Sequence, residues 1–273
     1  MFGKGEWTMA TVMREKKIKS ADRVLEIFEM FSGDRKSVTV MDVARALNVP
    51  QSSTSELLGS LVRRGYLYRD RTERTFRPTA RVALLGAWVQ PDLFRQGRLL
   101  PMMDSLHEVT GEAVILASLI GVDVKHVHVV GEGLPETLGS GTEHHPLHSP
   151  FGVALLSMMY RENVRKLVHR LNAESDPALH MRYSHLEPQL NTASRQGYAT
   201  GDLGDGRASV AVLLPERPGE EQLAIGIAGP VGRIAANSGQ LVQTLRGAIA
   251  QCFSPHSGQD LRQVERPALV AMH

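Results

Sequence analysis

Between residues 38 and 78, apolar positions follow the spacing of two short helices and then of a hairpin. The first helix has apolar side chains at residues 41, 43, 44 and 47, and Thr39 stands at its start as an N-cap. Pro50 ends this helix, because the residue before a proline is disfavoured in the α conformation. A second helix begins at Pro50 or Gln51 and ends at Gly65, with residues 54, 57, 58, 61 and 62 on its inner face.

The pattern changes after this second helix. Residues 66–69 and 75–78 have the composition of two short strands, and the polar residues 70–74 form a turn between them. Two helices joined by a tight turn and followed by a basic hairpin make a winged helix-turn-helix. The pattern therefore predicts a domain that binds DNA.

Further helices flank this motif on both sides. A helix capped by Ser20 has apolar residues at 21, 24, 25, 27, 28 and 31 and ends near Gly33, and we assign it to the same domain. Residues 82–89 and 93–109 are also expected to be helical. The second of these segments is too apolar to face water, which favours a connecting helix packed between domains or between two protomers.

From Gly111 onward, β-rich runs alternate with helical segments. The runs cover residues 113–119, 124–130, 209–214 and 223–227, and the helices cover residues 152–160, 161–171, 186–197 and 238–252. Strands arranged in this way predict an α+β domain with a largely antiparallel sheet flanked by helices. The expected organisation is a flexible basic arm (1–19), a winged helix-turn-helix domain (20–83), a linker or dimerisation helix (84–110), a second domain (111–254) and a flexible tail (255–273).

Charge is distributed unevenly along the 273 residues. Up to Arg81 there are 16 Lys and Arg against 10 Asp and Glu, whereas the remainder has 15 against 19. Cations beside phosphates displace condensed counterions, so the basic part favours DNA of any sequence, although solvated surface arginines are the simpler alternative. No apolar run approaches ~20 residues and no N-terminal apolar core is present, so we expect a cytoplasmic protein without membrane span or signal peptide. Cys252, the only cysteine, rules out an internal disulfide.

Several short sequence segments, in the same order as in the family, resemble the IclR family of bacterial transcription regulators over residues 19–252. In the first domain they cover residues 20–27, 43–47, 50–53, 57–58, 61–62 and 64–67, and in the second residues 146–148, 152, 154–156, 197–199 and 227–230. The resemblance implies an N-terminal winged helix-turn-helix and a linking helix. It also implies a C-terminal α+β effector domain similar to GAF domains, with dimers or tetramers assembled on operator DNA.

The resemblance further implies an effector-binding cleft in the second domain. The positions that fall where family members line this cleft are Leu138, His145, Pro150, Phe151 and Asp202. This chain departs from the family at three further cleft positions, with Ala208 where many relatives have a cysteine, and Gly226 and Ala228 where they have small hydroxyl residues. Fewer side-chain donors are left for a carboxylate, so recognition would rest on backbone N–H groups or on Ser209, Arg207 and the histidines.

Polar side chains at the start of the second helix are expected to contact bases, because a helix in the major groove brings its N-terminal residues nearest to the base edges. These residues are Gln51, Ser52, Ser53, Ser55 and Glu56. The alternative is that the serines merely cap the helix, and that the Glu56 carboxylate points away instead of accepting from a cytosine amino group. Four hairpin arginines are expected to bind phosphates or a narrow minor groove, namely Arg69, Arg71, Arg74 and Arg77.

Histidines offer a competing chemistry. His126 and His128 lie two residues apart on a predicted strand, which would point both imidazoles to one face as a zinc site requires, and His144, His145 and His148 follow in a loop. Because no cysteine pair accompanies them, surface or pocket-lining histidines are favoured, and we predict no bound metal and no cofactor.

Together these features predict an effector-responsive repressor of a catabolic operon. It would bind palindromic operator DNA as a homodimer or dimer of dimers, and a small organic metabolite, by family analogy a short organic acid, would relieve repression. One alternative is a metal- or metabolite-sensing protein whose winged domain mediates protein contacts. An enzyme is not expected, because the sequence has no Gly-x-Ser-x-Gly, Gly-x-x-x-x-Gly-Lys or His-Glu-x-x-His motif.

Overall fold

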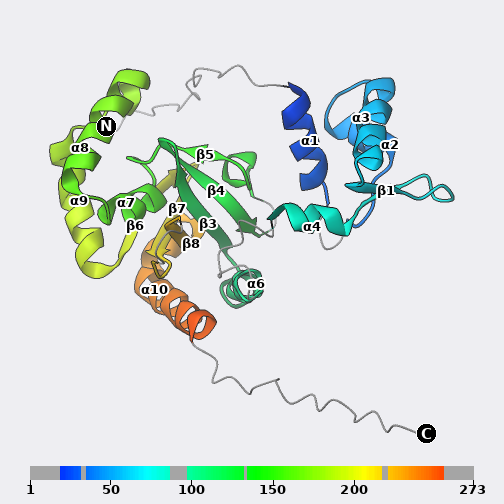
Figure 1. The fold of residues 1–273 in the computed structure, drawn as a ribbon. Helices are drawn as coiled ribbons and strands as arrows, with labels where there is room; N and C mark the ends of the chain where they lie inside the picture. Colours follow the sequence, from blue (N-terminus) through cyan, green and yellow to red (C-terminus); the bar gives the residue numbers. More distant parts are fainter. Residues whose placement is uncertain (1–18, 32–34, 87–96, 132–133, 217–220, 255–273) are drawn as a thin grey trace, which may run out of the picture. The chain divides into compact units, whose positions relative to one another are not determined.

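The computed structural model describes residues 19–31, 35–86, 97–131, 134–216 and 221–254. The chain divides into two compact units, residues 1–95 and 96–273, each of which is described by itself (Figure 1). The predicted basic arm before Lys19, the predicted tail and residues 87–96 of the predicted linker lie outside the described residues. The domain boundaries at residues 83 and 110 therefore stay predictions.

The first unit is a winged helix-turn-helix, as predicted. It consists of α1 (Lys19–Glu29), α2 (Val40–Ala46), α3 (Gln51–Arg63), the antiparallel strands β1 (Leu67–Arg69) and β2 (Phe76–Pro78), and α4 (Ala80–Gly86). Helices and hairpin enclose a small core made of Ile27, Val38, Val43, Leu58, Leu61, Leu67 and Phe76. The first helix begins at Lys19, so Ser20 lies inside its first turn and does not precede it as a cap, contrary to the prediction.

Local sequence signals set the ends of α2 and α3. Thr39 and Asp42 form a capping box, in which the Asp42 N–H donates to Thr39 Oγ1 at 3.2 Å and the Thr39 N–H donates to Asp42 Oδ2 at 2.8 Å. Asn48 turns the chain with a φ of 49°, and Pro50 directly precedes α3. The predicted N-cap at Thr39 and the predicted turn before α3 are confirmed.

The second unit is an α+β domain built on one sheet. Its elements are α6 (Leu99–Thr110), β3 (Ala113–Ile120), β4 (Asp123–Val130), η1 (Glu136–Leu138), β5 (Glu143–His144), α7 (Pro150–Ser157), α8 (Arg161–Glu174), η2 (Pro177–Leu179), α9 (Tyr183–Gln196), β6 (Tyr198–Gly204), β7 (Arg207–Leu213), β8 (Leu223–Pro230) and α10 (Val231–Phe253). The six strands pair antiparallel in the order β5-β4-β3-β8-β7-β6. Helices α7, α8 and α9 lie on one side of this sheet and α6 and α10 on the other (Figure 1). The predicted antiparallel sheet flanked by helices is confirmed.

Several elements differ from the prediction: β5 was not predicted, α6 begins at Leu99 and not at residue 93, and α10 and β6 also differ. Helix α10 begins at Val231, seven residues before the predicted start at Ser238. Pro230 favours a helix start, and the first turn is exposed, so it lacks the apolar residues from which the start was predicted. Strand β6 was not among the predicted strands. It contains Gly201, Asp202 and Gly204, which are poor strand formers, and it is held mainly by pairing with β7 at the edge of the sheet.

Helix α7 is fixed tightly against the sheet. A Cβ atom on Gly226 of β8 would lie 2.7 Å from two ring carbons of Phe151 and 2.5 Å from the carbonyl oxygen of Val210. At the next position of the helix, a Cβ on Gly152 would lie 2.1 Å from the carbonyl oxygen of Pro146. The helix is thus wedged between β8 and the segment that precedes it.

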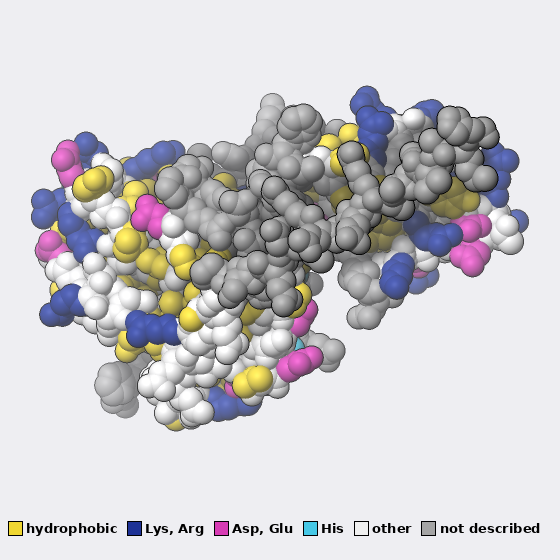
Figure 2. Space-filling view, turned by 60° about the horizontal axis from the view of Figure 1, so that its bottom comes forward, with side chains coloured by type: hydrophobic (Ala, Val, Ile, Leu, Met, Phe, Trp, Pro, Cys, Tyr) yellow, Lys and Arg dark blue, Asp and Glu magenta, His cyan; other side chains and the backbone are white. Residues whose placement is uncertain are grey.

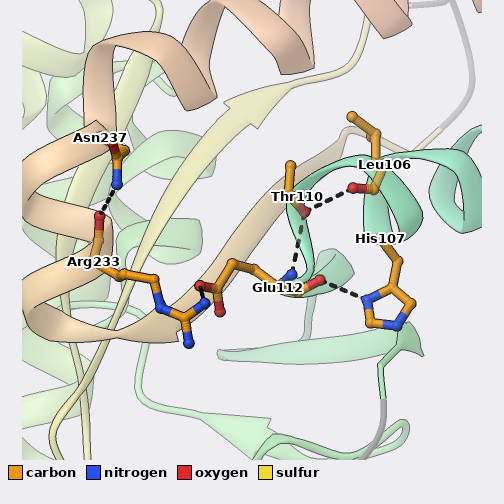
Figure 3. Close-up of polar contacts among 6 residues, drawn as sticks. All are labelled: Leu106, His107, Thr110, Glu112, Arg233 and Asn237. Atoms are coloured by element: carbon orange, nitrogen blue, oxygen red, sulfur yellow. Dashed lines mark hydrogen bonds and ion pairs between the residues drawn. The ribbon is translucent and has the colours of Figure 1, made fainter.

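On the opposite face of the sheet, Glu112 connects the end of α6 with the first turn of α10 (Figure 3). Its carboxylate pairs with Arg233 at 2.9 Å and lies against Gly229, where a Cβ would be 2.1 Å from Oε2. Its backbone carbonyl accepts from His107 Nδ1 at 2.8 Å, and its N–H donates to Thr110 Oγ1 at 3.3 Å. None of the described helices combines the length and the apolar character needed to cross a bilayer.

Candidate nucleic-acid interface and ligand site

Helix α3 presents a polar surface opposite its buried side. Thr54, Leu58 and Leu61 are buried. The five residues predicted to contact bases are all exposed, namely Gln51, Ser52, Ser53, Ser55 and Glu56. The N-cap of α3 is Pro50, which makes no side-chain capping bond, and Ser52, Ser53 and Ser55 have no hydrogen-bond partner in the described part of the chain. Capping therefore does not account for these serines, and their hydroxyl groups face solvent.

A hollow flanks this surface. A cavity of about 260 Å³ lies between α1 and α3, and its lining includes Ser20 and Arg23 of α1 with Ser53, Glu56 and Ser60 of α3. Lys and Arg side chains recur across the face of this unit that Figure 2 shows. Hydroxyl and guanidinium groups are the donors that proteins use to bind phosphate.

All four predicted arginines of the hairpin are exposed, but two of them make contacts with other hairpin residues. Arg77 pairs with Asp70 at 3.0 Å, and Arg69 lies 5.7 Å over the Phe76 ring. Backbone N–H groups of the turn hold the pKa of Asp70 below its usual range. Arg71 and Arg74, at the tip, have no ion pair within the described residues. Two of the four arginines are thus not held by any described residue and can bind phosphate.

In the second unit, the sheet face beneath α7 has a row of small residues. Strand register places Gly201, Ser209, Ala228 and Ala113 side by side on β6, β7, β8 and β3. Gly131, which follows β4, extends the row, because a Cβ there would lie 3.2 Å from the Cα of Ala113. Small side chains at adjacent strand positions let another group approach the sheet closely.

Two buried hydroxyl groups without partners belong to this region. Ser209 is fully buried and Ser149 is 3% exposed, and neither Oγ has a hydrogen-bond partner within the described residues. Ser149 directly precedes α7 but makes no side-chain capping bond. The next residue, Pro150, approaches the row, since its Cγ lies 3.2 Å from the position of a Cβ on Gly201. An unpaired buried hydroxyl costs free energy that a ligand oxygen can recover by hydrogen bonding.

Five of the eight predicted cleft residues come together on this side of the sheet, namely Leu138, Pro150, Phe151, Gly226 and Ala228. Asp202 and Ala208 pair with each other on β6 and β7 and alternate with the residues that face α7, so they point to the opposite face. The β7 residue of the row, which points toward α7, is Ser209. His145 lies in the loop before α7, where its Nε2 is 3.4 Å from Ser175 Oγ.

A β-bulge separates His126 and His128, contrary to the expectation that they share a face. Ala117 pairs with His126 and Leu116 pairs with His128, so Val127 is the extra residue and the two imidazoles lie on opposite faces. His126 is fully buried and stacks on His144 with ring centroids 4.1 Å apart. Strand spacing alone could not reveal this bulge.

The imidazoles of buried His126 and of half-buried His144 and His145 are uncharged at neutral pH. Burial lowers the pKa of His126 to about 3, with a further contribution from His144, whose own pKa is lowered by burial. Burial also lowers the pKa of His145 to about 4, helped by the neighbouring His148. These rings therefore cannot supply a cation for a carboxylate. Across the described ranges, no three His, Cys, Asp or Glu side chains are arranged to hold a metal ion.

Comparisons with known proteins find similar sequences and folds for both units. The model of the IclR helix-turn-helix domain matches residues 20–71. The transcriptional repressor IclR of Escherichia coli is 27% identical over 83% of this chain and 85% of the repressor, and the acetate operon repressor of Salmonella typhimurium is 26% identical over 80% and 82%. The crystal structure of an IclR homologue from Microbacterium hydrocarbonoxydans, complexed with 4-hydroxybenzoate, has the same fold, with a TM-score of 0.56 and 20% identity over 85% of this chain and 97% of that chain. The chain thus has an IclR helix-turn-helix domain at residues 20–71 and is similar over most of its length to repressors of the IclR family.

Proposed function

We propose that this protein represses a catabolic operon by binding a palindromic operator, and that a small organic ligand relieves the repression. The observation that carries this proposal is the exposed polar side of α3 beside a hairpin whose Arg71 and Arg74 have no ion pair among the described residues. Two of its relatives are named as repressors, one of them of the acetate operon, which supports repression as the mode of action. A protein that binds chromosomal DNA in a bacterium would act in the cytoplasm.

Two-fold assembly is supported by an apolar patch on the first unit. Leu84 and Leu85 of α4 are 62% and 57% exposed and line a hollow together with Tyr66 and Arg81. Exposed leucines at adjacent positions are costly in water, so a second copy covering them would stabilise a homodimer, or a dimer of dimers. A two-fold protein requires half-sites separated by about whole helical turns, roughly 34 Å each.

The effector would bind beneath α7, where Ser149 and Ser209 can donate to its oxygen atoms. The homologue crystallised with 4-hydroxybenzoate supports a small organic acid as the ligand. His126 and the half-buried His145 nearby are uncharged, so hydroxyl and backbone N–H groups would carry the recognition. Such a ligand relieves repression only by its preference for the conformation that binds DNA poorly, typically by ~1–3 kcal/mol.

The test is a measurement of DNA affinity against salt. Short duplexes are selected from a random-sequence library with the full-length protein, and the affinity for the enriched duplex is measured over a series of NaCl concentrations. The double variant Arg71→Ala/Arg74→Ala should bind more weakly, with a log–log salt slope reduced by about 0.9 for each phosphate that the variant no longer neutralises.

A matched control removes two exposed cations from the second unit. Lys166 and Arg170 of α8 have side chains 72% and 61% exposed, each in an ion pair with a glutamate four residues away. Lys166→Ala/Arg170→Ala should leave the salt slope unchanged. Failure to enrich any duplex, or equal losses in both double variants, would refute binding through the wing.

A further inference from the structure

The outward side of α3 continues along the whole helix. Ser52, Glu56, Gly59 and Arg63 are spaced by four, three and four residues, which places them in one stripe on a helix. The stripe lies opposite the buried residues Thr54, Leu58 and Leu61. Ser52, Glu56 and Arg63 are exposed and Gly59 is half-buried.

Gly59 has no structural role that the described residues explain. A Cβ at this position would meet only the end of the Arg63 side chain, at an ordinary distance of 3.5 Å, and Gly59 is not among the glycines with a positive φ. Gly226, Gly229 and Gly152 differ in this respect, because backbone or buried atoms occupy the space of their Cβ. Glycine is among the least favourable residues inside a helix. Gly239 and Gly247 of α10 also meet no neighbour, and Gly59 differs from them because it lies on the polar outward side of α3.

A missing Cβ on an outward helix face lets another molecule approach the backbone closely. The hollow lined by Arg23, Ser53 and Ser60 runs beside the same part of α3, and Ser60 also accepts a hydrogen bond from Arg63 Nη2 at 2.8 Å. Polar groups therefore occur along both the stripe and its flank, where Leu47, Val49 and Leu57 also line the hollow. A contact confined to the N-terminal turn would leave Gly59, Ser60 and Arg63 unused.

We propose that α3 lies lengthwise against the duplex, with its backbone closest to the DNA at Gly59, and that the hollow between α1 and α3 receives the sugar-phosphate backbone of one strand. In this arrangement Ser52 and Glu56 face base edges on one side of Gly59, and Arg63 binds a phosphate on the other side. This inference rests on the proposed function, since it specifies how the same helix meets the operator.

The experiment compares Gly59→Ala with the wild-type protein on the duplex enriched from the random library. The variant should melt at the same temperature or a few degrees higher, because alanine favours the helix and fits the available space. Its affinity for the duplex should nevertheless fall at least about tenfold, because the added methyl group separates the helix from the DNA. A gain in stability combined with a loss of binding cannot come from damage to the fold.

Gly239→Ala is the matched control, since Gly239 is an exposed glycine in α10 with nothing within 4 Å of its Cβ position. It should show the same stabilisation with unchanged DNA affinity. Arg23→Gln should lower the salt slope by about 0.9 without changing which duplex is enriched. If wild-type protein enriches no duplex, the proposed function fails; if it does and Gly59→Ala binds as tightly, or Arg23→Gln leaves the slope unchanged, the lengthwise arrangement is overturned.

Discussion

Substitution of Gly226 by alanine is expected to destabilise the second unit through its contact with α7. The new Cβ would lie 2.5 Å from the carbonyl oxygen of Val210 and 2.7 Å from two carbons of the Phe151 ring. The Phe151 ring is fully buried, and the next residue of α7, Gly152, lies against the backbone of Pro146, so α7 has little room to shift. Overpacking of this kind costs roughly 1–3 kcal/mol, and the backbone contact places this case near the upper end.

Chemical and thermal unfolding of the full-length protein measures this effect. With a loss of roughly 2–3 kcal/mol, the melting temperature of the second unit should fall by roughly 4–12 °C, at about 2–4 °C per kcal/mol for units of this size. The control Gly247→Ala places the same methyl group on an exposed glycine of α10 with nothing within 4 Å, and should stabilise by up to about 1 kcal/mol.

A double-variant cycle tests the stated cause. Phe151→Leu removes the ring carbons, so in its presence Gly226→Ala should cost less than in the wild type, with a coupling of about 0.5–3 kcal/mol. Phe151→Leu should remove only part of the destabilisation caused by Gly226→Ala, because the contact with the Val210 carbonyl remains. Strictly additive losses, or a Gly226→Ala variant as stable as Gly247→Ala, would refute the reasoning.

Two further predictions concern buried polar groups of the second unit. Ser209→Ala should leave the unfolding free energy unchanged or raise it by up to about 1 kcal/mol, because it removes a buried hydroxyl without a partner, whereas Ser118→Ala loses a hydrogen bond to Glu221 and should cost about 1 kcal/mol. In a thermal-shift screen of two- to six-carbon acids and 4-hydroxybenzoate, only Ser209→Ala should lose the ligand response; a retained response would exclude Ser209 from the site. Because the pKa of His126 is lowered to about 3 in the folded protein, the unfolded chain binds more protons, so stability should fall as the pH drops from about 6.5 toward 3. Urea unfolding at a series of pH values measures how steeply the unfolding free energy depends on pH. His126→Phe should reduce this dependence, while the control His128→Phe should not. An equal dependence in wild type and His126→Phe would contradict the lowered pKa of His126.

Much of the first unit could be predicted from local sequence signals. The Thr39 cap, the Asn48 and Pro50 turn, and the glycine after α3 act on neighbouring residues, and each has the expected effect in the structure. The binary pattern of α3 likewise separates buried Thr54 from the exposed serines around it. Contacts within a few residues are sufficient for these features, so the sequence alone contains them.

The residues of the proposed ligand site were predicted less completely because their positions depend on strand pairing. The bulge at Val127 places His126 and His128 on opposite faces, although their spacing indicates one face. Side-chain alternation in β7 directs Ser209 toward α7 and Ala208 away from it, and only the pairing with β6 and β8 shows which of the two faces α7. A one-residue change of register reverses every side chain of a strand, so proximity on the sheet cannot be inferred from chain position.

The amino-acid sequence by itself determined the winged helix-turn-helix, the antiparallel α+β domain and the resemblance to the IclR family, because periodicity, caps and turns act over short distances along the chain. The tertiary structure decided which buried polar groups lack hydrogen-bond partners. It also decided at which glycines neighbouring atoms occupy the space of a Cβ, and that this space is open at Gly59. These properties arise where segments distant in sequence pack together, and they depend on distances of a few tenths of an ångström that no linear pattern specifies.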